Sequence, residues 1–224
     1  QRMESKHLGV IFDWDGVVLD SSRFHEESWS LLASDRSLPL PDGHFHRGFG
    51  MRNESIIPEI LGWSHNPEEI QELAFAKETL YRKLLSHTGI DPLPGVLKLL
   101  IELKSREIPT AVGSSTPREN LELAIQLLGL EEYFQATVCG DDVTRGKPFP
   151  DVFELAAQKI GCDASRCLVI EDAPVGIEAA RNAQMKCVAV TTTNPAQTLA
   201  FADLVVNSLQ ELNAEQLIKL VGNE

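Results

Sequence analysis

Short apolar runs alternate with helix-like segments along most of this chain, and that alternation limits the possible folds more than any other feature. The apolar runs cover residues 7–12, 109–113, 136–139, 167–170, 187–190 and 204–206. Strands that alternate with amphipathic helices are typical of a parallel sheet covered by helices on both faces. We therefore predict an α/β fold with a doubly wound, Rossmann-like parallel sheet.

The segments between and after these runs carry apolar residues at helical spacing. The segment 95–106, for example, has apolar residues at helical spacing: Val96, Leu97, Leu99, Leu100, Ile101 and Leu103. Another such segment begins with Pro117, a residue that the first turn of a helix tolerates. The predicted helices of the sheet region are 95–106, 117–128, 150–160, 174–183 and 209–221.

The region 22–88 interrupts the alternation. It contains amphipathic helical stretches over 24–33, 54–61 and 67–85, and it has no convincing strand. We interpret it as a helical domain inserted after the first strand. The expected domains are a catalytic core formed by 1–21 and 89–224 and a small helical insertion formed by 22–88.

Composition and charge exclude several classes of partner. Of the 224 residues, 43% are hydrophobic and 24% are charged, as in ordinary globular proteins, and the formal net charge is −13. A field of that sign repels nucleic acid and anionic membranes, so neither is an expected partner. We expect a small-molecule ligand and a monomer or weak dimer, although the sequence does not fix the oligomeric state.

Targeting and cysteine features favour a reducing compartment. No apolar run is long enough to span a membrane, and the first ten residues lack the apolar stretch of a secretory signal. The cysteines at 139, 162, 167 and 187 form no metal-binding spacing and are interpreted as buried free thiols. The expected location is cytoplasmic or soluble within an organelle.

Polar side chains follow four of the predicted strands at the points where those strands end. Ligands of open α/β sheets bind at the carboxyl ends of the strands, so these side chains are expected to converge on one edge. This convergence is the strongest functional signal in the sequence. In chain order the residues are Asp13 and Asp15; Ser114, Ser115 and Thr116; Lys147; and Glu171 and Asp172.

The residue types suit phosphoryl transfer. A carboxylate is ionised at neutral pH, so Asp13 can act as a nucleophile. Asp15, two residues later, could protonate a leaving oxygen and then activate water, provided that its pKa is raised. Mg²⁺ prefers oxygen ligands, which Asp13, Asp172 and the main-chain carbonyl of Asp15 would supply. Glu171 is a weaker candidate ligand.

Two further residues supply hydrogen-bond donors for phosphate oxygens. Ser114 and Lys147 fill this role, and Lys147 also offsets the charge of the acidic cluster. Thr116 is predicted to cap the following helix. Each of these residues alone has an ordinary alternative: an Asp-x-Asp pair is often a solvated loop, and a lone lysine is usually a surface residue. The sequence Gly146-Lys147-Pro148 is not a Walker loop, because Pro148 replaces Ser or Thr.

Together these motifs resemble the haloacid dehalogenase superfamily over nearly the whole chain. The matching segments are FDWDGVVLDS (12–21), AVGSST (111–116), RGKPFPDVF (145–153) and VIEDAPVGIEAARNA (169–183). The resemblance implies that Asp13 is the nucleophile, Asp15 the acid and base, Ser114 and Lys147 the phosphate binders, and Asp172 a metal ligand. The insertion is similar to the small helical cap of the β-phosphoglucomutase-like branch, which opens to admit substrate and closes to exclude water.

The resemblance also suggests substrate-binding residues outside the strand ends. His25, Arg52 and Lys77 match cap or hinge positions of the sugar phosphomutases. Taken alone, His25 is more often a surface or hinge histidine, and Lys77 a solvated lysine on a helix. Ser115, Thr116 and Arg118 are further candidates. The mutases usually carry Lys-Asn where this chain has Pro117-Arg118, and this departure favours a phosphatase over a mutase.

Three segments, LGWSHNPEEI (61–70), STPRENLELAI (115–125) and MKCVAV (185–190), resemble plant-type phosphatases that act on 5-amino-6-(5-phosphoribitylamino)uracil. The predicted function is Mg²⁺-dependent hydrolysis of a small phosphorylated metabolite, either of this type or a sugar phosphate. The alternatives are a sugar phosphomutase and a catalytically silent metabolite-binding protein. A haloacid dehalogenase is disfavoured, because Asp15 and Asp172 build a metal site that its chemistry does not use.

Overall fold

The computed structural model describes residues 8–48 and 51–222. The chain divides into two compact units, which we call the sheet unit (Gln1–Asp20 and Asp91–Glu224) and the helical unit (Ser21–Ile90). His7, the expected first residue of the first strand, lies outside the described residues.

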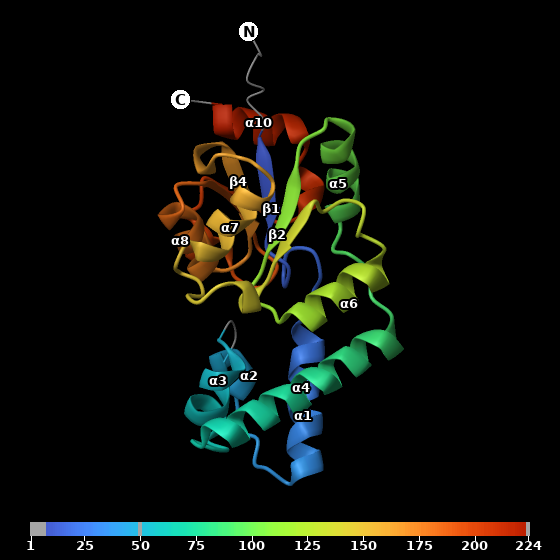
Figure 1. Cartoon of the computed structure of the whole chain (residues 1–224), viewed down its shortest axis with the longest axis vertical. Helices are drawn as coiled ribbons and strands as arrows, with labels where there is room; N and C mark the ends of the chain where they lie inside the picture. Colours follow the sequence, from blue (N-terminus) through green and yellow to red (C-terminus); the bar gives the residue numbers. More distant parts are fainter. Residues whose placement is uncertain (1–7, 49–50, 223–224) are drawn as a thin grey trace. The chain divides into compact units, whose positions relative to one another are not determined.

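The sheet unit is built on a parallel sheet of six strands in the order β3-β2-β1-β4-β5-β6. Figure 1 labels β1, β2 and β4 of this sheet. The predicted doubly wound α/β fold is therefore confirmed. β1 lies at the centre, paired with β2 on one side and β4 on the other. The strands are β1 (Gly9–Phe12), β2 (Thr110–Gly113), β3 (Ala136–Val138), β4 (Cys167–Glu171), β5 (Lys186–Val190) and β6 (Leu204–Val206).

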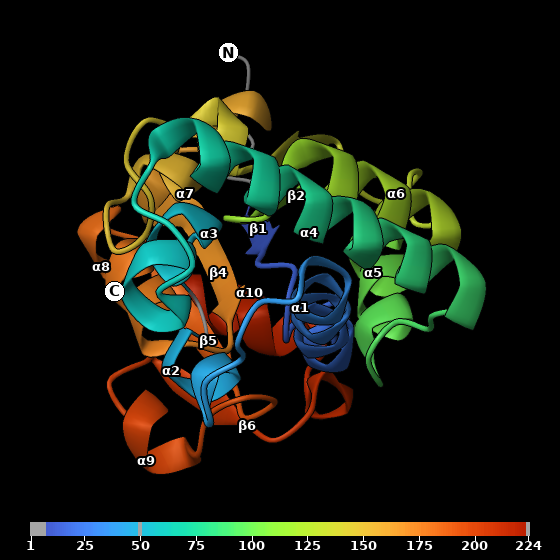
Figure 2. The same ribbon diagram turned by 90° about the horizontal axis from the view of Figure 1, so that it is seen from below.

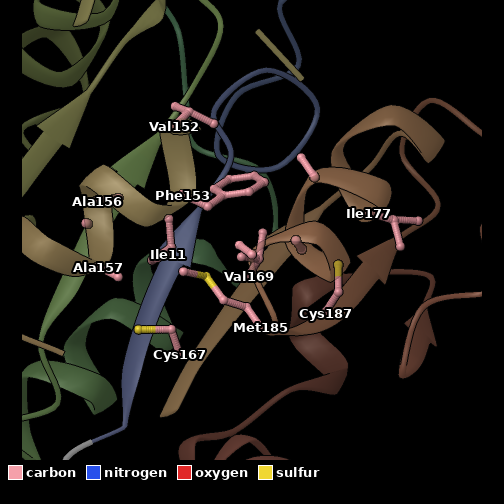
Figure 3. Close-up of a cluster of buried hydrophobic side chains, with 14 of the residues drawn as sticks. Ile11, Val152, Phe153, Ala156, Ala157, Cys167, Val169, Ile177, Met185 and Cys187 are labelled. Carbon is pink, nitrogen blue, oxygen red and sulfur yellow. The ribbon is translucent and has the colours of Figure 1, made fainter. Parts of the chain in front are cut away.

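The central strands are apolar on both faces because helices cover both sides of the sheet. On one face α7 (Asp151–Lys159) and α8 (Pro174–Asn182) pack over β1 and β4. Figure 3 shows Phe153 of α7 against Ile11 and Val169, and all three side chains are fully buried. The parallel pairing of β1 with β4 sends their carboxyl ends to the same edge of the sheet.

Other helices complete the sheet unit. They are α5 (Val96–Ser105), α6 (Arg118–Leu128), α9 (Ala196–Leu199) and α10 (Ala214–Gly222), with the short 3₁₀ turns η2 (Gly140–Asp142), η3 (Ala164–Arg166) and η4 (Leu209–Glu211). The expected continuous helix over 209–221 is wrong, because η4 and α10 are separate. Asn213 caps α10: its Oδ1 accepts from the Gln216 N–H, and Gln216 Oε1 accepts from the Asn213 N–H.

The helical unit is formed by α1 (Ser22–Arg36), α2 (His44–Gly48), α3 (Asn53–Ser55), the π-helical segment η1 (Ile56–Leu61) and α4 (Pro67–Thr88). The long helices α1 and α4 pack against each other (Figure 2). Trp29, Leu32, Ile57 and Leu73 form part of their shared core. Asn66 begins α4 by accepting hydrogen bonds from two main-chain N–H groups of its first turn.

Two sequence expectations can be compared with the described residues. Among the described residues, no helix is both long enough and apolar enough to cross a membrane. All four cysteines are free thiols. Cys139, Cys167 and Cys187 are buried as expected, whereas Cys162 is only half-buried in the turn after α7.

Candidate active site

The pairing of β1 with β4 brings two acidic segments together at one edge of the sheet. Phe12 and Ile170 are partners in the strand register, and the Asp13 N–H donates to the Ile170 carbonyl over 2.9 Å. The residues that follow therefore emerge side by side. The three side chains Asp13, Glu171 and Asp172 are buried, and one carboxylate oxygen of each lies within 4.8 Å of the others.

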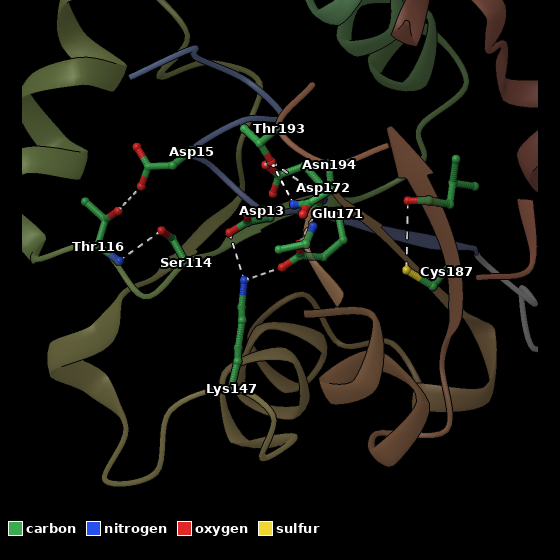
Figure 4. A network of polar contacts seen from close by, with 12 residues as sticks. Asp13, Asp15, Ser114, Thr116, Lys147, Glu171, Asp172, Cys187, Thr193 and Asn194 are labelled. Atoms are coloured by element: carbon green, nitrogen blue, oxygen red, sulfur yellow. Dashed lines mark hydrogen bonds and ion pairs between the residues drawn. The ribbon is translucent and has the colours of Figure 1, made fainter. Parts of the chain in front are cut away.

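Lys147 approaches this cluster from the segment between β3 and α7 (Figure 4). Its Nζ donates to Asp13 Oδ1 over 2.8 Å and to Glu171 Oε1 over 2.6 Å, and its side chain is only 7% exposed. Three carboxylates against one ammonium give the cluster a formal charge of −2 when all are ionised. That excess of buried negative charge is unfavourable unless a cation or a proton offsets it.

Burial raises the pKa of Asp13 to about 7, with repulsion from Glu171 adding to the effect and Lys147 opposing it. Burial also raises the pKa of Asp172 well above its usual range, and both Glu171 and Asp13 contribute. For Lys147, burial favours the neutral form. Attraction to Asp13 and Glu171 outweighs it and raises the pKa, so the lysine stays charged.

These pKa values predict how stability depends on pH in the absence of divalent cations. Because the pKa of Asp13 rises from 3.8 to about 7 on folding, the folded chain binds more protons than the unfolded chain between those values. The contribution of Asp13 to stability is therefore present at low pH and is lost as pH rises through about 7. A pKa that differs by one between the folded and the unfolded chain changes the free energy of unfolding by about 1.4 kcal/mol.

The Asp13→Asn variant removes this titration. It also relieves the repulsion that Asp13 exerts on Asp172, which lowers the pKa of Asp172 and changes stability in the same direction. In excess chelator, we expect the variant to gain stability over the unmodified protein progressively between pH 4 and pH 7. Urea unfolding across this range, followed by circular dichroism, measures the difference. A difference that does not change with pH would contradict the assignment of the titration to Asp13.

Asp15 and the residues after β2 form a second group beside the carboxylates (Figure 4). The Thr116 hydroxyl donates to Asp15 Oδ2, and the Thr116 N–H donates to Ser114 Oγ over 3.1 Å. The prediction that Thr116 caps the next helix is wrong. Pro117 occupies the cap position of α6, and the carboxylate of Asp141 accepts from the Arg118 N–H instead.

Glu171 has both carboxylate oxygens engaged by the chain. Oε1 accepts from Lys147, and Oε2 accepts from the main-chain N–H groups of Asp172 and Ala173 over 2.8 and 3.0 Å. The close approach depends on Gly176 in α8, because a Cβ added there would lie 1.8 Å from Oε1. This arrangement favours Glu171 as the residue that holds Lys147.

The sequence reasoning overlooked Thr193 and Asn194. They follow β5, whose carboxyl end lies at the same edge, and both contact Asp172. The Thr193 hydroxyl donates to Asp172 Oδ2, and Asn194 Nδ2 donates to the Asp172 main-chain oxygen over 3.0 Å. The signal available was the polar run Thr191–Asn194 directly after a predicted strand.

Arg118 and Ser115 lie apart from this set of contacts. The Arg118 guanidinium donates to both carboxylate oxygens of Asp142 over 2.6 Å and also pairs with Glu122 over 3.4 Å. The positive charge of Arg118 is thus paired with two carboxylates of the same chain. Ser115 is exposed.

Within the helical unit, two of the predicted substrate contacts touch each other. Lys77 is 2% exposed, and its Nζ donates to His25 Nδ1 over 2.6 Å and to Glu78 Oε1 over 3.0 Å. The His25 ring stacks on Tyr81 with the ring centres 4.1 Å apart. Arg52 is exposed at the start of α3. The lysine is therefore a buried, paired group and not a solvated helix residue.

The carboxylate cluster fits a hard divalent cation. Oxygen ligands are those that Mg²⁺ prefers, and the formal excess of negative charge is of the sign that a cation offsets. Comparison with known proteins identifies the family. A family model described as haloacid dehalogenase-like hydrolase matches residues 8–184.

This chain belongs to the haloacid dehalogenase-like hydrolase family. It is therefore an enzyme of the hydrolase class, and the resemblance carried by the four sequence motifs is confirmed. The chain is 37% identical, over its whole length, to the chloroplastic 5-amino-6-(5-phospho-D-ribitylamino)uracil phosphatase of Arabidopsis thaliana. It spans 60% of the length of that relative.

Two further proteins match over nearly their full length. The β-phosphoglucomutase of Bacillus subtilis is 33% identical, with 93% of this chain and 92% of the relative covered. A crystal structure of a family IA, variant 3 hydrolase from Entamoeba histolytica superposes with a TM-score of 0.88 at 28% identity. That match covers 96% of this chain and all of the other.

Proposed function

We propose that this protein is a Mg²⁺-dependent phosphatase that hydrolyses a small phosphorylated metabolite through an aspartyl-phosphate on Asp13. The observation that carries the proposal is the contact of Lys147 with Asp13 and Glu171 beside Asp172, at one edge of the sheet. This set combines a nucleophilic carboxylate, a buried cation that can contact phosphate oxygens, and oxygen ligands for a metal.

Asp13, Asp172 and the main-chain carbonyl of Asp15 are the proposed ligands of the cation, which when bound offsets the negative charge of the carboxylates and the phosphate. Glu171 keeps Lys147 in place. Offsetting this charge also keeps Asp13 ionised at neutral pH, because without a cation burial and the neighbouring carboxylates, opposed by Lys147, raise its pKa to about 7.

The reaction proceeds in two displacements at phosphorus. Asp13 forms a bond to phosphorus while the bond to the substrate oxygen breaks, and Asp15 donates a proton to that oxygen. Water then attacks the phosphorus of the aspartyl-phosphate, Asp15 accepts a proton from it, and the bond to Asp13 breaks. Ser114 accepts from the Thr116 N–H, so its own hydroxyl proton remains for a phosphate oxygen.

Chelation tests the metal requirement. Excess EDTA is expected to abolish phosphate release, and added Mg²⁺ is expected to restore it, because an uncompensated acidic cluster repels an anionic substrate. Release of inorganic phosphate from a generic aryl phosphate gives the measurement, with Ca²⁺ as a comparison cation. Full activity in excess chelator would remove the metal from the mechanism, and no release under any condition would favour a silent binding protein.

The choice between a phosphatase and a sugar phosphomutase depends on Arg118. A mutase must hold a second phosphate group, whereas the Arg118 guanidinium is paired with Asp142 and Glu122. This pairing supports hydrolysis. Incubation with a sugar 1-phosphate separates the two functions: a phosphatase releases inorganic phosphate, and a mutase forms the 6-phosphate isomer.

The proposed substrate class is a phosphoribityl-pyrimidine or a sugar phosphate. The first is supported by the 37% identity to the Arabidopsis phosphatase. His25, Arg52 and Lys77 of the helical unit remain proposed substrate contacts. A panel of phosphorylated metabolites that includes both classes, ranked by kcat/KM, tests the proposal. Comparable low values for every member would contradict a dedicated phosphoribityl-pyrimidine phosphatase.

A further inference from the structure

Two residues after β5 form a directed chain of hydrogen bonds that ends on Asp172 (Figure 4). Asn194 Nδ2 donates to the Asp172 main-chain oxygen over 3.0 Å and to Thr193 Oγ1 over 3.1 Å. A carbonyl oxygen can only accept, so this contact fixes which end of the Asn194 amide faces Asp172. The two N–H groups of one amide thus hold both the main chain of Asp172 and the hydroxyl of Thr193.

The direction of the Thr193 hydroxyl follows from these contacts. A hydroxyl has one proton to donate, and its oxygen already accepts from Asn194. The proton is therefore available to Asp172, whose Oδ2 lies closer to Thr193 Oγ1 than its main-chain oxygen, at 3.4 Å. Asp172 is held at its main chain and at one carboxylate oxygen, and both contacts come from residues next to each other in sequence.

The backbone of Gly16 approaches the same carboxylate oxygen. A Cβ added at Gly16 would lie 2.0 Å from Asp172 Oδ2 and 3.2 Å from Thr193 Cγ2. The backbone of Gly16, at φ 79°, therefore passes directly beside the oxygen that Thr193 binds. Thr193 and the Gly16 backbone thus both lie at Oδ2, whereas Oδ1 of Asp172 accepts no hydrogen bond from the described residues.

We infer that Thr193 and Asn194 are positioning residues that orient Asp172 so that its Oδ1 binds the divalent cation; this inference rests on the proposed function. The physical reason is charge repulsion. Asp172 lies within 4.8 Å of two other carboxylates, which favour rotation of its side chain away from them. Partners that hydrogen-bond to a ligating carboxylate keep it oriented for the metal, and their loss typically weakens metal binding about 10–100-fold.

Mg²⁺ affinity measured by isothermal titration calorimetry, without substrate, tests the inference. Thr193→Val is expected to weaken Mg²⁺ binding about 10–100-fold, whereas Thr193→Ser keeps the hydroxyl and should bind like the unmodified protein. Thr191→Val is the matched control. Thr191 lies two residues before Thr193, and its hydroxyl donates to Asn207 and not to Asp172. At saturating Mg²⁺, kcat of Thr193→Val should return close to that of the unmodified protein.

Equal Mg²⁺ affinity in Thr193→Val and the unmodified protein would overturn the inference, and so would equal losses in the Thr193 and Thr191 variants. If Thr193→Val does not fold, Asn194→Leu replaces it, since it removes both amide donors and should also weaken Mg²⁺ binding. If Thr193→Val binds Mg²⁺ more weakly but the unmodified protein releases no phosphate, the inference is supported and the proposed phosphatase function is refuted. If Thr193→Val binds Mg²⁺ normally and the unmodified protein releases phosphate, the inference is refuted and the phosphatase function is supported.

Discussion

Asp13→Asn is expected to abolish phosphate release while leaving the fold intact. The amide has nearly the shape of the carboxylate but cannot attack phosphorus, so no aspartyl-phosphate forms. We expect a loss of more than about a hundredfold in kcat, the lower end of what one catalytic group usually contributes. Phosphate release at saturating Mg²⁺ gives the measurement, with Asp15 and Lys147 unchanged.

Two observations keep this result interpretable. Circular dichroism and thermal unfolding should show that the variant is folded. When cations are absent, the variant should be more stable than the unmodified protein, because its carboxylate cluster carries less negative charge. Asp20→Asn is the matched control, because Asp20 is an exposed carboxylate later in the same segment and should keep full activity. If Asp13→Asn retained more than about a hundredth of the metal-dependent activity, Asp13 would not be the nucleophile.

Gly176→Ala is expected to destabilise the protein strongly. The added methyl group would lie 1.8 Å from Glu171 Oε1 and 1.9 Å from its carboxyl carbon, so the buried side chain must move. Movement breaks the 2.6 Å ion pair with Lys147 and the hydrogen bonds that Glu171 accepts from the start of α8. Disruption of a buried ion pair typically costs about 3–5 kcal/mol, and urea unfolding measures this loss.

The matched control for this substitution is Gly222→Ala. Gly222 is also helical, but a Cβ there meets open space, and replacing glycine in a helix normally stabilises it slightly. A double variant separates steric conflict from other causes: in a Glu171→Ala background the same Gly176→Ala change should cost much less. If Gly176→Ala were as stable as the unmodified protein, the Glu171 side chain would have room to move and would not be held in place by α8.

Sequence patterns alone were sufficient to predict the parallel sheet and the convergence of polar residues at the ends of its strands. Parallel strands point their carboxyl ends to one edge, so a carboxylate after the first run and two after the fourth could be expected to meet. The pairing of β1 with β4 brings Asp13 beside Glu171 and Asp172. The proximity of Lys147 followed from the same logic, because it comes after a third strand of the same sheet.

Local propensity misled where a tertiary contact competed with it. Thr116 has the side chain of a helix cap, but its hydroxyl donates to Asp15, which is distant in sequence. The carboxylate of Asp141 accepts from the first main-chain N–H of α6 instead. The apolar spacing of 209–221 suggested one helix, yet Asn213 and Gln216 cap each other and begin a new one. In both cases a specific hydrogen bond outweighs a weak local preference.

The sequence by itself determined which polar side chains follow the strands, because apolar patterning locates the strands and the carboxyl ends of parallel strands meet at one edge of the sheet. Only the tertiary structure decided how those side chains are held. The contacts of Thr193 and Asn194 with Asp172, and of Arg118 with Asp142, depend on the path of loops after the strands. Apolar periodicity carries no information about those paths, since loop conformation is set by the partners that the backbone and side chains find.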